Sequence, residues 1–338
     1  MPERKRIKTK IKEKEVEKEE VKTNYFSNEN RDIEFIGSGC TLLDCVLGGG
    51  WAMGRVSNVI GDTSSNKTGA AIEAMANFRV KYPDGYIWYL DAEAAFDIDY
   101  AKKIGLPDDD KTFVSKTRDI KTTAAMINKA IELVKEEDVP GFFGIDSYDA
   151  LWPLNEKGEL AEGFDGAKRA SLLNSLITVV TPRVEEANMH LMVVSQVRDN
   201  IGATFGDKFR ISGGKALPFY ASQRVMFAKI KELTKTVEGV KDAYGILVKA
   251  KCKKNKIGVP FRSCEFPVEF YYGINDLLAN LTWLNMVKKL KEFTTEKNMK
   301  AFATENRNNK AVKKQVSNYT TSEWNRIQSG FLPENSKY

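Results

Sequence analysis

Residues 61–68, GDTSSNKT, have the frame of a phosphate-binding loop, Gly-x-x-x-x-Gly-Lys-Ser/Thr. In such a loop successive backbone N–H groups point into one concavity at a helix N-terminus, where they bind phosphate. The lysine adds charge beside the phosphates, and the hydroxyl that follows it holds Mg²⁺. The residues of this candidate loop are Gly61, Asp62, Thr63, Ser64, Ser65, Asn66, Lys67 and Thr68.

Asn66 stands where the frame requires its second glycine. Glycine serves there because it accepts left-handed backbone angles without steric cost. Asparagine is one of the few other residues that reach this region without a large penalty. We therefore interpret the loop as a nucleotide site with one unusual residue, and expect Asn66→Gly to preserve or tighten nucleotide binding. A loop that has lost its ligand and a chance match are the alternatives.

The elements around the loop alternate in type. Apolar runs predict strands at 55–60, 85–93, 141–147 and 190–196, and helical spacing predicts helices at 68–82, 122–137 and 167–188. Strands separated by helices of this length imply βαβ units and a parallel sheet. The apolar strand before the loop and the helix after it favour a genuine phosphate site over a chance match.

Polar residues follow the carboxyl ends of these strands, where ligands bind in open α/β sheets. Asp146 suits a carboxylate that orients Mg²⁺ through water. Glu93 suits a general base that polarises an attacking water, and Gln196 suits a sensor of the γ-phosphate. Helix caps and loop hydrogen bonds are the plainer roles for all three residues.

The rest of the chain predicts an extension of this core. Strands at 222–233, 244–256 and 262–272 extend the sheet in antiparallel fashion, and 277–338 forms a small helical piece in which Trp283 and Trp324 pack. We expect three parts: a charged N-terminal segment, 1–34, which is a candidate for oligomerisation; an ATPase core, 35–276; and a basic C-terminal piece, 277–338. The predicted fold class is α/β with a mostly parallel central sheet.

Charge is unevenly distributed. The net charge is +6, of which residues 1–23 contribute +3 and residues 277–338 contribute +6, leaving −3 for the middle. Basic ends either attract a polyanion or keep the protein in solution.

The chain contains no run of about 18 apolar residues, so we expect no membrane-spanning helix. Four scattered cysteines fit a reducing compartment, the cytoplasm, and the single histidine, His190, is expected in the core.

Two loops are candidates for nucleic-acid contact. Residues 198–213 are rich in glycine and carry Arg198, Lys208 and Arg210. Residues 154–166 are followed by Lys168 and Arg169. Long loops in compact domains are usually functional or disordered. A plain surface loop is the alternative in both cases.

Several segments together resemble the RecA family of strand-exchange recombinases, including phage recombinases of the UvsX type. They are 37–61, 89–106 (YLDAEAAFDIDYAKKIGL), 144–151 (GIDSYDAL), 193–206, 213–222 and 253–261. The resemblance spans about 35–275 and implies a RecA-like ATPase fold. It makes Glu93 the catalytic base, places Asp97 and Tyr100 at adenine, and puts Asp146 and Ser147 in the magnesium-binding strand.

The same resemblance implies an ATP- and Mg²⁺-dependent recombinase that forms helical filaments on single-stranded DNA and exchanges strands with duplex DNA. A single-strand-binding protein and a loading mediator are further partners that it suggests, with no membrane involved. It assigns the remaining residues as follows: Gln196, Arg198 and Ile201 to the second DNA-binding loop, Gly213 and Gly214 to the end of that loop, Phe219 to the subunit interface, and Lys254 and Lys256 to the neighbour's ATP. The first DNA loop matches poorly, and no counterpart of the family's N-terminal oligomerisation domain is evident.

Two other functions remain open at this point. A DNA-coating or scaffold protein would retain the fold without binding or cleaving ATP, although Lys67, Thr68, Glu93 and Asp146 argue against it. A hexameric helicase motor would need an arginine finger and interfaces that close a ring. The lysine pair in KKNK favours a filament over a ring.

Overall fold

Apolar runs form the centre of the sheet. In the computed structural model, which describes residues 33–163, 165–199, 209–211, 214–290 and 295–333, these runs are β3 (Val56–Gly61), β4 (Tyr86–Asp91), β6 (Gly141–Asp146) and β7 (Met189–Asp199). Strands that are covered on both faces are apolar throughout rather than alternating. Every residue of β3 and β6 is buried, as that rule requires.

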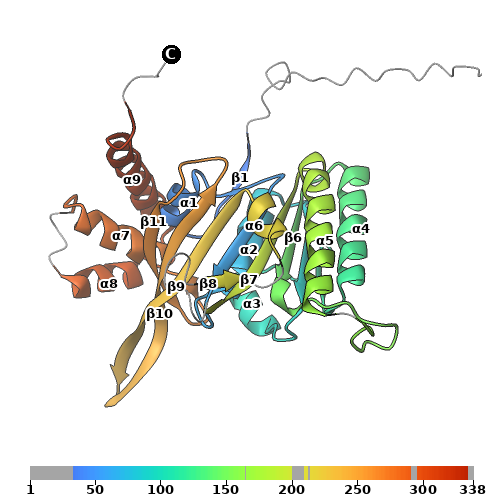
Figure 1. Cartoon of the computed structure of the whole chain (residues 1–338). Helices are drawn as coiled ribbons and strands as arrows, with labels where there is room; N and C mark the ends of the chain where they lie inside the picture. The colour runs from blue at the N-terminus through green and yellow to red at the C-terminus, as the bar shows by residue number, and fades with distance from the viewer. Residues whose placement is uncertain (1–32, 164, 200–208, 212–213, 291–294, 334–338) are drawn as a thin grey trace, which may run out of the picture. The chain divides into compact units, whose positions relative to one another are not determined.

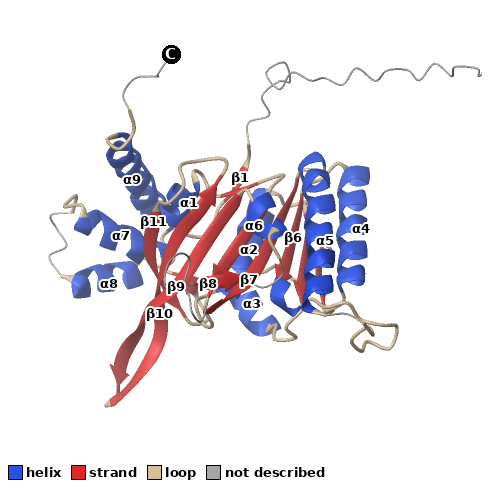
Figure 2. Cartoon of the chain, viewed as in Figure 1, coloured by secondary structure: helices blue, strands red, loops and turns tan. Residues whose placement is uncertain are grey.

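The sheet is parallel in its middle and antiparallel at one side (Figure 2). Its strand order is β12-β11-β10-β9-β3-β7-β6-β4-β5, and β8 (Phe209–Ile211) pairs with β7. The pairs β3–β7, β3–β9, β6–β7, β4–β6 and β4–β5 are parallel. The antiparallel extension consists of β9 (Gln223–Val237), β10 (Val240–Asn255), β11 (Ser263–Glu269) and β12 (Gly273–Ile274). The predicted fold class is thus confirmed.

Helices cover both faces of the sheet (Figure 1). Helix α2 (Lys67–Lys81) packs into a core with Tyr89, Phe142 and Met192, whereas α4 (Ile120–Glu137) and α5 (Gly166–Glu186) pack into a second core with Leu90, Phe143 and Leu191. Adjacent strand residues enter different cores because side chains alternate across a strand. The short elements are β1 (Phe35–Ile36), α1 (Thr41–Leu47), β2 (Trp51–Ala52), α3 (Ile98–Ile104), β5 (Thr112–Ser115), the 3₁₀ turn Tyr148–Ala150 and α6 (Ala216–Tyr220).

The C-terminal helices α7 (Asp276–Met286), α8 (Glu296–Glu305) and α9 (Lys310–Ser329) pack beside the antiparallel strands. The rings of Trp283 and Trp324 lie 5.7 Å apart between centroids, as expected for packing residues. Thr41 on α1 donates to Asp276, and its hydroxyl lies 2.8 Å from that of Ser317 on α9. Residues 34–338 form one compact unit, and the predicted boundary at 276 stays a prediction.

Some helices and strands differ from those predicted from the sequence. Helices α1 and α3, of seven residues each, and strand β5, of four residues, were not predicted. The β9–β10 hairpin is longer than predicted and projects beyond the rest of the sheet (Figure 1).

His190 lies in the core, as predicted. It is fully buried and donates from Nδ1 to Ala52 O at 2.8 Å, and burial lowers its pKa to about 4. All four cysteines are free thiols, and none of the described helices is long and apolar enough to cross a membrane.

Candidate functional site

The loop at 61–68 connects β3 to α2, which begins at Lys67. Asn66 has φ 69° and ψ 29°, the left-handed conformation that the sequence argument requires of this position. Gly61 lies so close to β9 that an added Cβ would stand 2.3 Å from the carbonyl oxygen of Phe227. The backbone path of the loop is therefore closely constrained at its start, and α2 contributes first-turn N–H groups that need no partner within the helix.

Lys67 folds back over this loop. Its Nζ donates to the carbonyl oxygen of Asp62 at 2.6 Å, and the residue is only 8% exposed. Burial lowers the pKa of the ammonium, while the carboxylates of Asp146 and Glu93 oppose that change. The lysine is thus a buried cation directed at the concavity where phosphate would bind.

Asp146 ends β6 beside the loop. One of its carboxylate oxygens, Oδ2, accepts from the Thr68 hydroxyl at 2.5 Å and from the Tyr89 hydroxyl at 2.8 Å. Burial raises the pKa of Asp146, and these two donors partly counteract it. Sequence reasoning identified Thr68 and Asp146 but missed Tyr89, which lies on β4 two residues before its acidic end.

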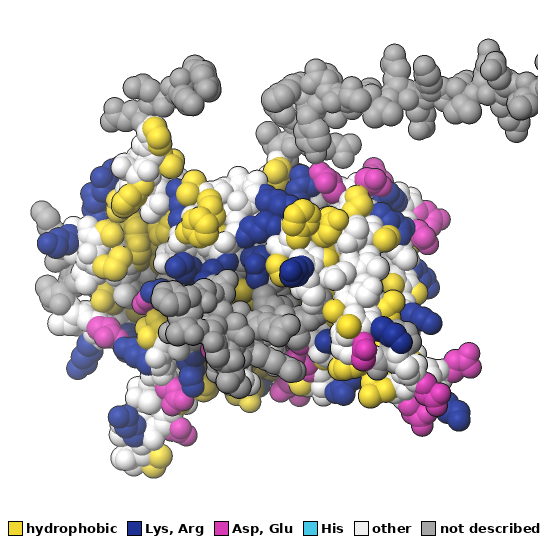
Figure 3. All heavy atoms as spheres, in the orientation of Figure 1, with side chains coloured by type: hydrophobic (Ala, Val, Ile, Leu, Met, Phe, Trp, Pro, Cys, Tyr) yellow, Lys and Arg dark blue, Asp and Glu magenta, His cyan; other side chains and the backbone are white. Residues whose placement is uncertain are grey.

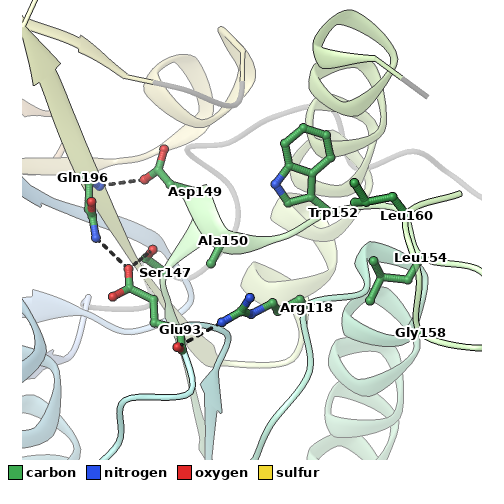
Figure 4. A pocket seen from close by; sticks show the side chains of 10 residues that line it. All are labelled: Glu93, Arg118, Ser147, Asp149, Ala150, Trp152, Leu154, Gly158, Leu160 and Gln196. Atoms are coloured by element: carbon green, nitrogen blue, oxygen red, sulfur yellow. Dashed lines mark hydrogen bonds between the residues drawn. The ribbon is translucent and has the colours of Figure 1, made fainter.

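Glu93 and Gln196 meet at the edge of the sheet (Figure 4). Gln196 Nε2 donates to Glu93 Oε1 at 2.8 Å, and the Ser147 hydroxyl donates to the same oxygen. The backbone N–H of Gln196 donates to Asp149 Oδ2 at 2.6 Å. The two polar residues that the sequence placed at strand ends are therefore in direct contact, 103 positions apart in the chain.

The turn that carries Glu93 is held by residues that the sequence argument did not single out. The Asp91 carboxylate accepts from the N–H groups of Ala95 and Phe96 at 3.1 and 3.0 Å. On the other side, Arg118 donates to the carbonyl oxygens of Ala92 and Glu93 at 2.9 and 3.2 Å. The acidic repeat in LDAEAAFD could have indicated Asp91, whereas nothing in the sequence indicates Arg118.

Two open pockets adjoin these residues. One, of about 580 Å³, is lined by Glu93, Arg118 and Gln196 and by the apolar side chains of Trp152 and Leu160 (Figure 4). The other, of about 380 Å³, includes Ser64 and Asn66 of the phosphate loop in its wall. Its lining residues are Ser64, Asn66, Tyr100, Lys229, Glu232, Ala243, Ile246, Val268 and Phe270.

Tyr100 lines this second pocket, and Asp97 lies at the start of the helix that carries Tyr100. The ring of Tyr100 meets that of Tyr271 edge-on at 5.6 Å, and Asp97 caps α3 by accepting from the Tyr100 N–H at 2.9 Å. A pocket lined in part by apolar and aromatic side chains, next to a phosphate loop, fits a nucleotide base. The adenine contacts expected of both residues remain predictions.

A separate cluster joins Phe219, Lys254 and Lys256. Phe219 is 68% exposed, and both lysine Nζ atoms lie over its ring, at 5.8 and 5.9 Å from the centroid. Lys254 Nζ also donates to Pro218 O at 3.0 Å, and burial, with help from Lys256 and Arg224, lowers its pKa to about 8. Lysine and arginine side chains gather over the region of α6 on the face shown in Figure 3.

The structure corrects one predicted DNA contact. Arg169 is only 7% exposed, and its guanidinium donates to Leu151 O at 2.7 Å and to Asp149 O at 2.8 Å while lying over the Trp152 ring. These interactions fasten the base of the 154–166 loop, so Arg169 is a structural residue rather than a surface cation. Lys168 is exposed and donates to Gly163 O.

The second predicted DNA loop is described only at its ends. Arg198 and Arg210 oppose each other in the antiparallel pairing of β7 with β8. Gly214 has φ +90° and lies against Asn174. The predicted contacts at Ile201, Lys208 and Gly213 lie outside the described residues.

Comparison with known proteins identifies the family of this chain. Residues 5–275 match the family model described as the RecA N-terminal domain. The chain belongs to the RecA family. It is 34% identical over 246 residues to Protein RecA of Nostoc punctiforme, covering 72% of this chain and 65% of the relative. It is 34% identical over 251 residues to Protein RecA of Corynebacterium efficiens, covering 73% and 62%.

A third RecA-family relative is similar to the same extent. Protein RecA of Streptomyces avermitilis is 33% identical over 248 residues, covering 73% of this chain and 63% of the relative. The chain thus spans somewhat less than two thirds of the length of these relatives.

Proposed function

We propose that this protein is a DNA-dependent ATPase of the recombinase type, which forms helical filaments on single-stranded DNA and promotes homologous pairing and strand exchange with duplex DNA. The observation that carries the proposal is the contact between Gln196 and Glu93. Gln196 lies on β7, and the same strand continues to Asp199, at the start of the second candidate DNA loop. A nucleotide that contacts Gln196 and a DNA strand at that loop would therefore act near the same end of one strand.

Binding of the triphosphate is assigned to the loop and the first turn of α2. Lys67 would exchange the Asp62 carbonyl for phosphate oxygens, which are the stronger partners for a buried cation. Tyr100 and the second pocket would receive the base. Asn66 keeps the loop in its left-handed conformation and so preserves the N–H groups that hold phosphate.

The residues present also fit Mg²⁺. Thr68 Oγ1 and Asp146 Oδ2 are adjacent hard oxygen donors, and Mg²⁺ in phosphate sites uses one or two such groups together with water and phosphate oxygens. The described residues contain no cluster of three or more His, Cys, Asp or Glu, which such a site does not require. When bound, Mg²⁺ neutralises charge on the phosphates.

Glu93 is assigned to orient the attacking water. Its carboxylate accepts from Ser147 and Gln196, so its direction is already fixed by two donors. A general base must lie within hydrogen-bond reach of the proton that it takes. When Gln196 turns toward the γ-phosphate it releases one of these bonds, which links the nucleotide state to the position of β7.

Contact with a neighbouring copy is assigned to the cluster of Phe219, Lys254 and Lys256. An exposed aromatic ring with two cations over it is suited to meet a protein partner and, through the ammonium groups, a polyphosphate. ATP held by one protomer and approached by the lysines of the next would make assembly and nucleotide state depend on each other. The two loops would grip DNA phosphates largely without reading sequence.

The proposal also covers the type of recombinase, its location, its accessory partners and the roles of the two terminal segments. Assignment to the phage recombinases of UvsX type, with activity in the bacterial cytoplasm, is proposed from the sequence resemblance. A single-strand-binding protein and a loading mediator are the accessory partners proposed. The N-terminal segment and the basic C-terminal piece are proposed to contribute to assembly and to DNA capture.

The test measures ATP hydrolysis with and without single-stranded DNA, and images the protein on DNA with a non-hydrolysable ATP analogue. We expect hydrolysis that DNA stimulates, together with helical filaments. Filaments on DNA without hydrolysis in either condition would favour the scaffold, and closed rings would favour the helicase motor.

A further inference from the structure

A continuous chain of hydrogen bonds joins the base of the 154–166 loop to the turn that carries Glu93. Its first part is backbone pairing: Trp152 N donates to Arg118 O at 2.7 Å, and Ile120 N donates to Trp152 O at 3.1 Å. The pairing is that of neighbouring parallel strands, with Asp119 opposite Trp152. Residues 118–120 and 152–154 are therefore joined by backbone hydrogen bonds.

The side chain of Asp119 strengthens this pairing. Its Oδ1 accepts from Leu154 N at 3.0 Å, while Oδ2 accepts from the N–H of Thr122 at 2.8 Å and caps α4. Burial opposes ionisation of this carboxyl, but the N–H donors of Leu154 and Thr122 outweigh it and lower its pKa. One carboxylate thus fastens the start of the loop to the N-terminus of a helix.

The side chain of Arg118 completes the connection. Nε donates to Ala92 O at 2.9 Å and Nη2 donates to Glu93 O at 3.2 Å. The planar guanidinium holds both carbonyls in one fixed geometry, which a flexible ammonium does not do. Figure 4 shows Arg118 approaching the Glu93 turn from the loop side of the pocket, whereas Gln196 reaches the Glu93 carboxylate from the other side.

We propose that Arg118 is a positioning residue that couples the 154–166 loop to catalysis: DNA seated on this loop sets the position of Glu93 through residues 152–154, Asp119 and the Arg118 guanidinium. The proposal rests on the proposed function, because it takes Glu93 as the base and the loop as a DNA contact. It adds a second connection between DNA and the nucleotide site, distinct from the one through Gln196.

Arg118→Ala provides the main test. The side chain is exposed, so the fold should survive, and the backbone pairing of residue 118 with Trp152 does not need it. We expect the DNA-stimulated kcat to fall about 10-fold, because small misplacement of a catalytic group is costly, while KM for ATP and ATP-dependent DNA binding change less than about 2-fold. Arg118→Lys should recover part of the loss, since an ammonium can reach one carbonyl.

Two further variants separate coupling from simple damage. Asp119→Ser retains a good N-cap for α4. Serine has one side-chain oxygen instead of two, so it cannot accept from both Thr122 N and Leu154 N. It should reduce stimulation by DNA as Arg118→Ala does, and the double variant should be no worse than either single one, because the two groups act in series. Lys121→Ala, which removes an exposed cation three positions from Arg118, is the matched control and should behave like wild type.

The ratio of stimulated to basal rate decides the outcome. A ratio unchanged in Arg118→Ala, whether both rates are normal or both fall equally, would overturn the coupling, and so would additive losses in the double variant. Loss of DNA binding in Arg118→Ala would also overturn it, by making the arginine a direct contact. Absence of stimulation in the wild-type protein would instead defeat the proposed function, so the two failures are distinguishable.

Discussion

The side chain of Asn66 occupies the space that a side chain at position 69 would need. A Cβ added to Gly69 would stand 2.1 Å from Asn66 Oδ1 and 2.9 Å from Asn66 Cγ. The Nδ2 atom of Asn66 is buried and has no hydrogen-bond partner within the described part of the chain. The unusual residue of the phosphate loop is therefore matched by a small residue in the first turn of α2.

This pairing predicts a compensating effect between two substitutions. Gly69→Ala should force the Asn66 side chain to rotate toward the base pocket that it lines, and weaken ATP binding about 10-fold, or 1.4 kcal/mol. Asn66→Gly should preserve or tighten binding, because glycine adopts the left-handed conformation freely. The double variant should bind like Asn66→Gly alone. Titration calorimetry with ATP measures all four proteins, and a double variant as weak as Gly69→Ala would contradict the pairing.

Lys67→Ala should abolish nucleotide-dependent DNA binding. The substitution removes the buried cation that faces the carboxylates of Asp146 and Glu93, and a hydrogen bond to a charged group contributes about 1.5–3 kcal/mol. Fluorescence anisotropy of labelled single-stranded DNA, with and without ATP, measures the effect, and a thermal melt confirms that the variant is folded. Unchanged ATP-dependent binding would remove the phosphate loop from the mechanism.

Part of the site could be predicted from the sequence. The order of apolar runs and helices placed the loop, Glu93, Asp146 and Gln196 at one edge of a parallel sheet, because the carboxyl ends of parallel strands meet there. The backbone angles of Asn66 followed from residue type alone. In each case a local pattern sufficed.

Other features depended on contacts between distant residues and could not be predicted. Arg169 is adjacent to Lys168 at the start of a helix and has the sequence pattern of a surface cation, yet backbone carbonyls and the Trp152 ring enclose its guanidinium. Arg118 is 25 positions from the Glu93 carbonyl to which it donates. Gly69 is unremarkable in a helix until the Asn66 side chain is placed beside it.

Glu93→Gln should slow ATP turnover at least about 100-fold, the lower range for loss of a general base, while ATP-stabilised filaments persist. Glutamine keeps an oxygen that can accept from Ser147 and Gln196, so the turn should remain in place. Steady-state hydrolysis and electron microscopy of the same sample give the two readouts. If turnover and filaments are lost together, the role of Glu93 is structural.

The buried carboxyl of Glu73 predicts a specific pH dependence of stability. Glu73 lies on α2, is 7% exposed, and accepts from Ile274 N at 2.6 Å. Burial raises its pKa from 4.5 to about 8; the Ile274 N–H and Lys313 oppose this change, and Asp276 adds to it. The folded protein therefore retains a proton that the unfolded chain releases near pH 4.5.

The sign of the effect follows from this difference. Below pH 4.5 both states are protonated at Glu73, so its contribution is constant; between pH 4.5 and 8 only the folded state is protonated, and the free energy of unfolding falls as pH rises. Glu73→Gln cannot titrate and keeps an oxygen for Ile274 N. It should therefore flatten the decline and be more stable than wild type at pH 8, with a residual slope from Asp44, whose pKa burial raises to about 7. Urea denaturation between pH 5 and 8.5 measures both slopes, and parallel slopes in the two proteins would show that Glu73 is ionised in the folded state.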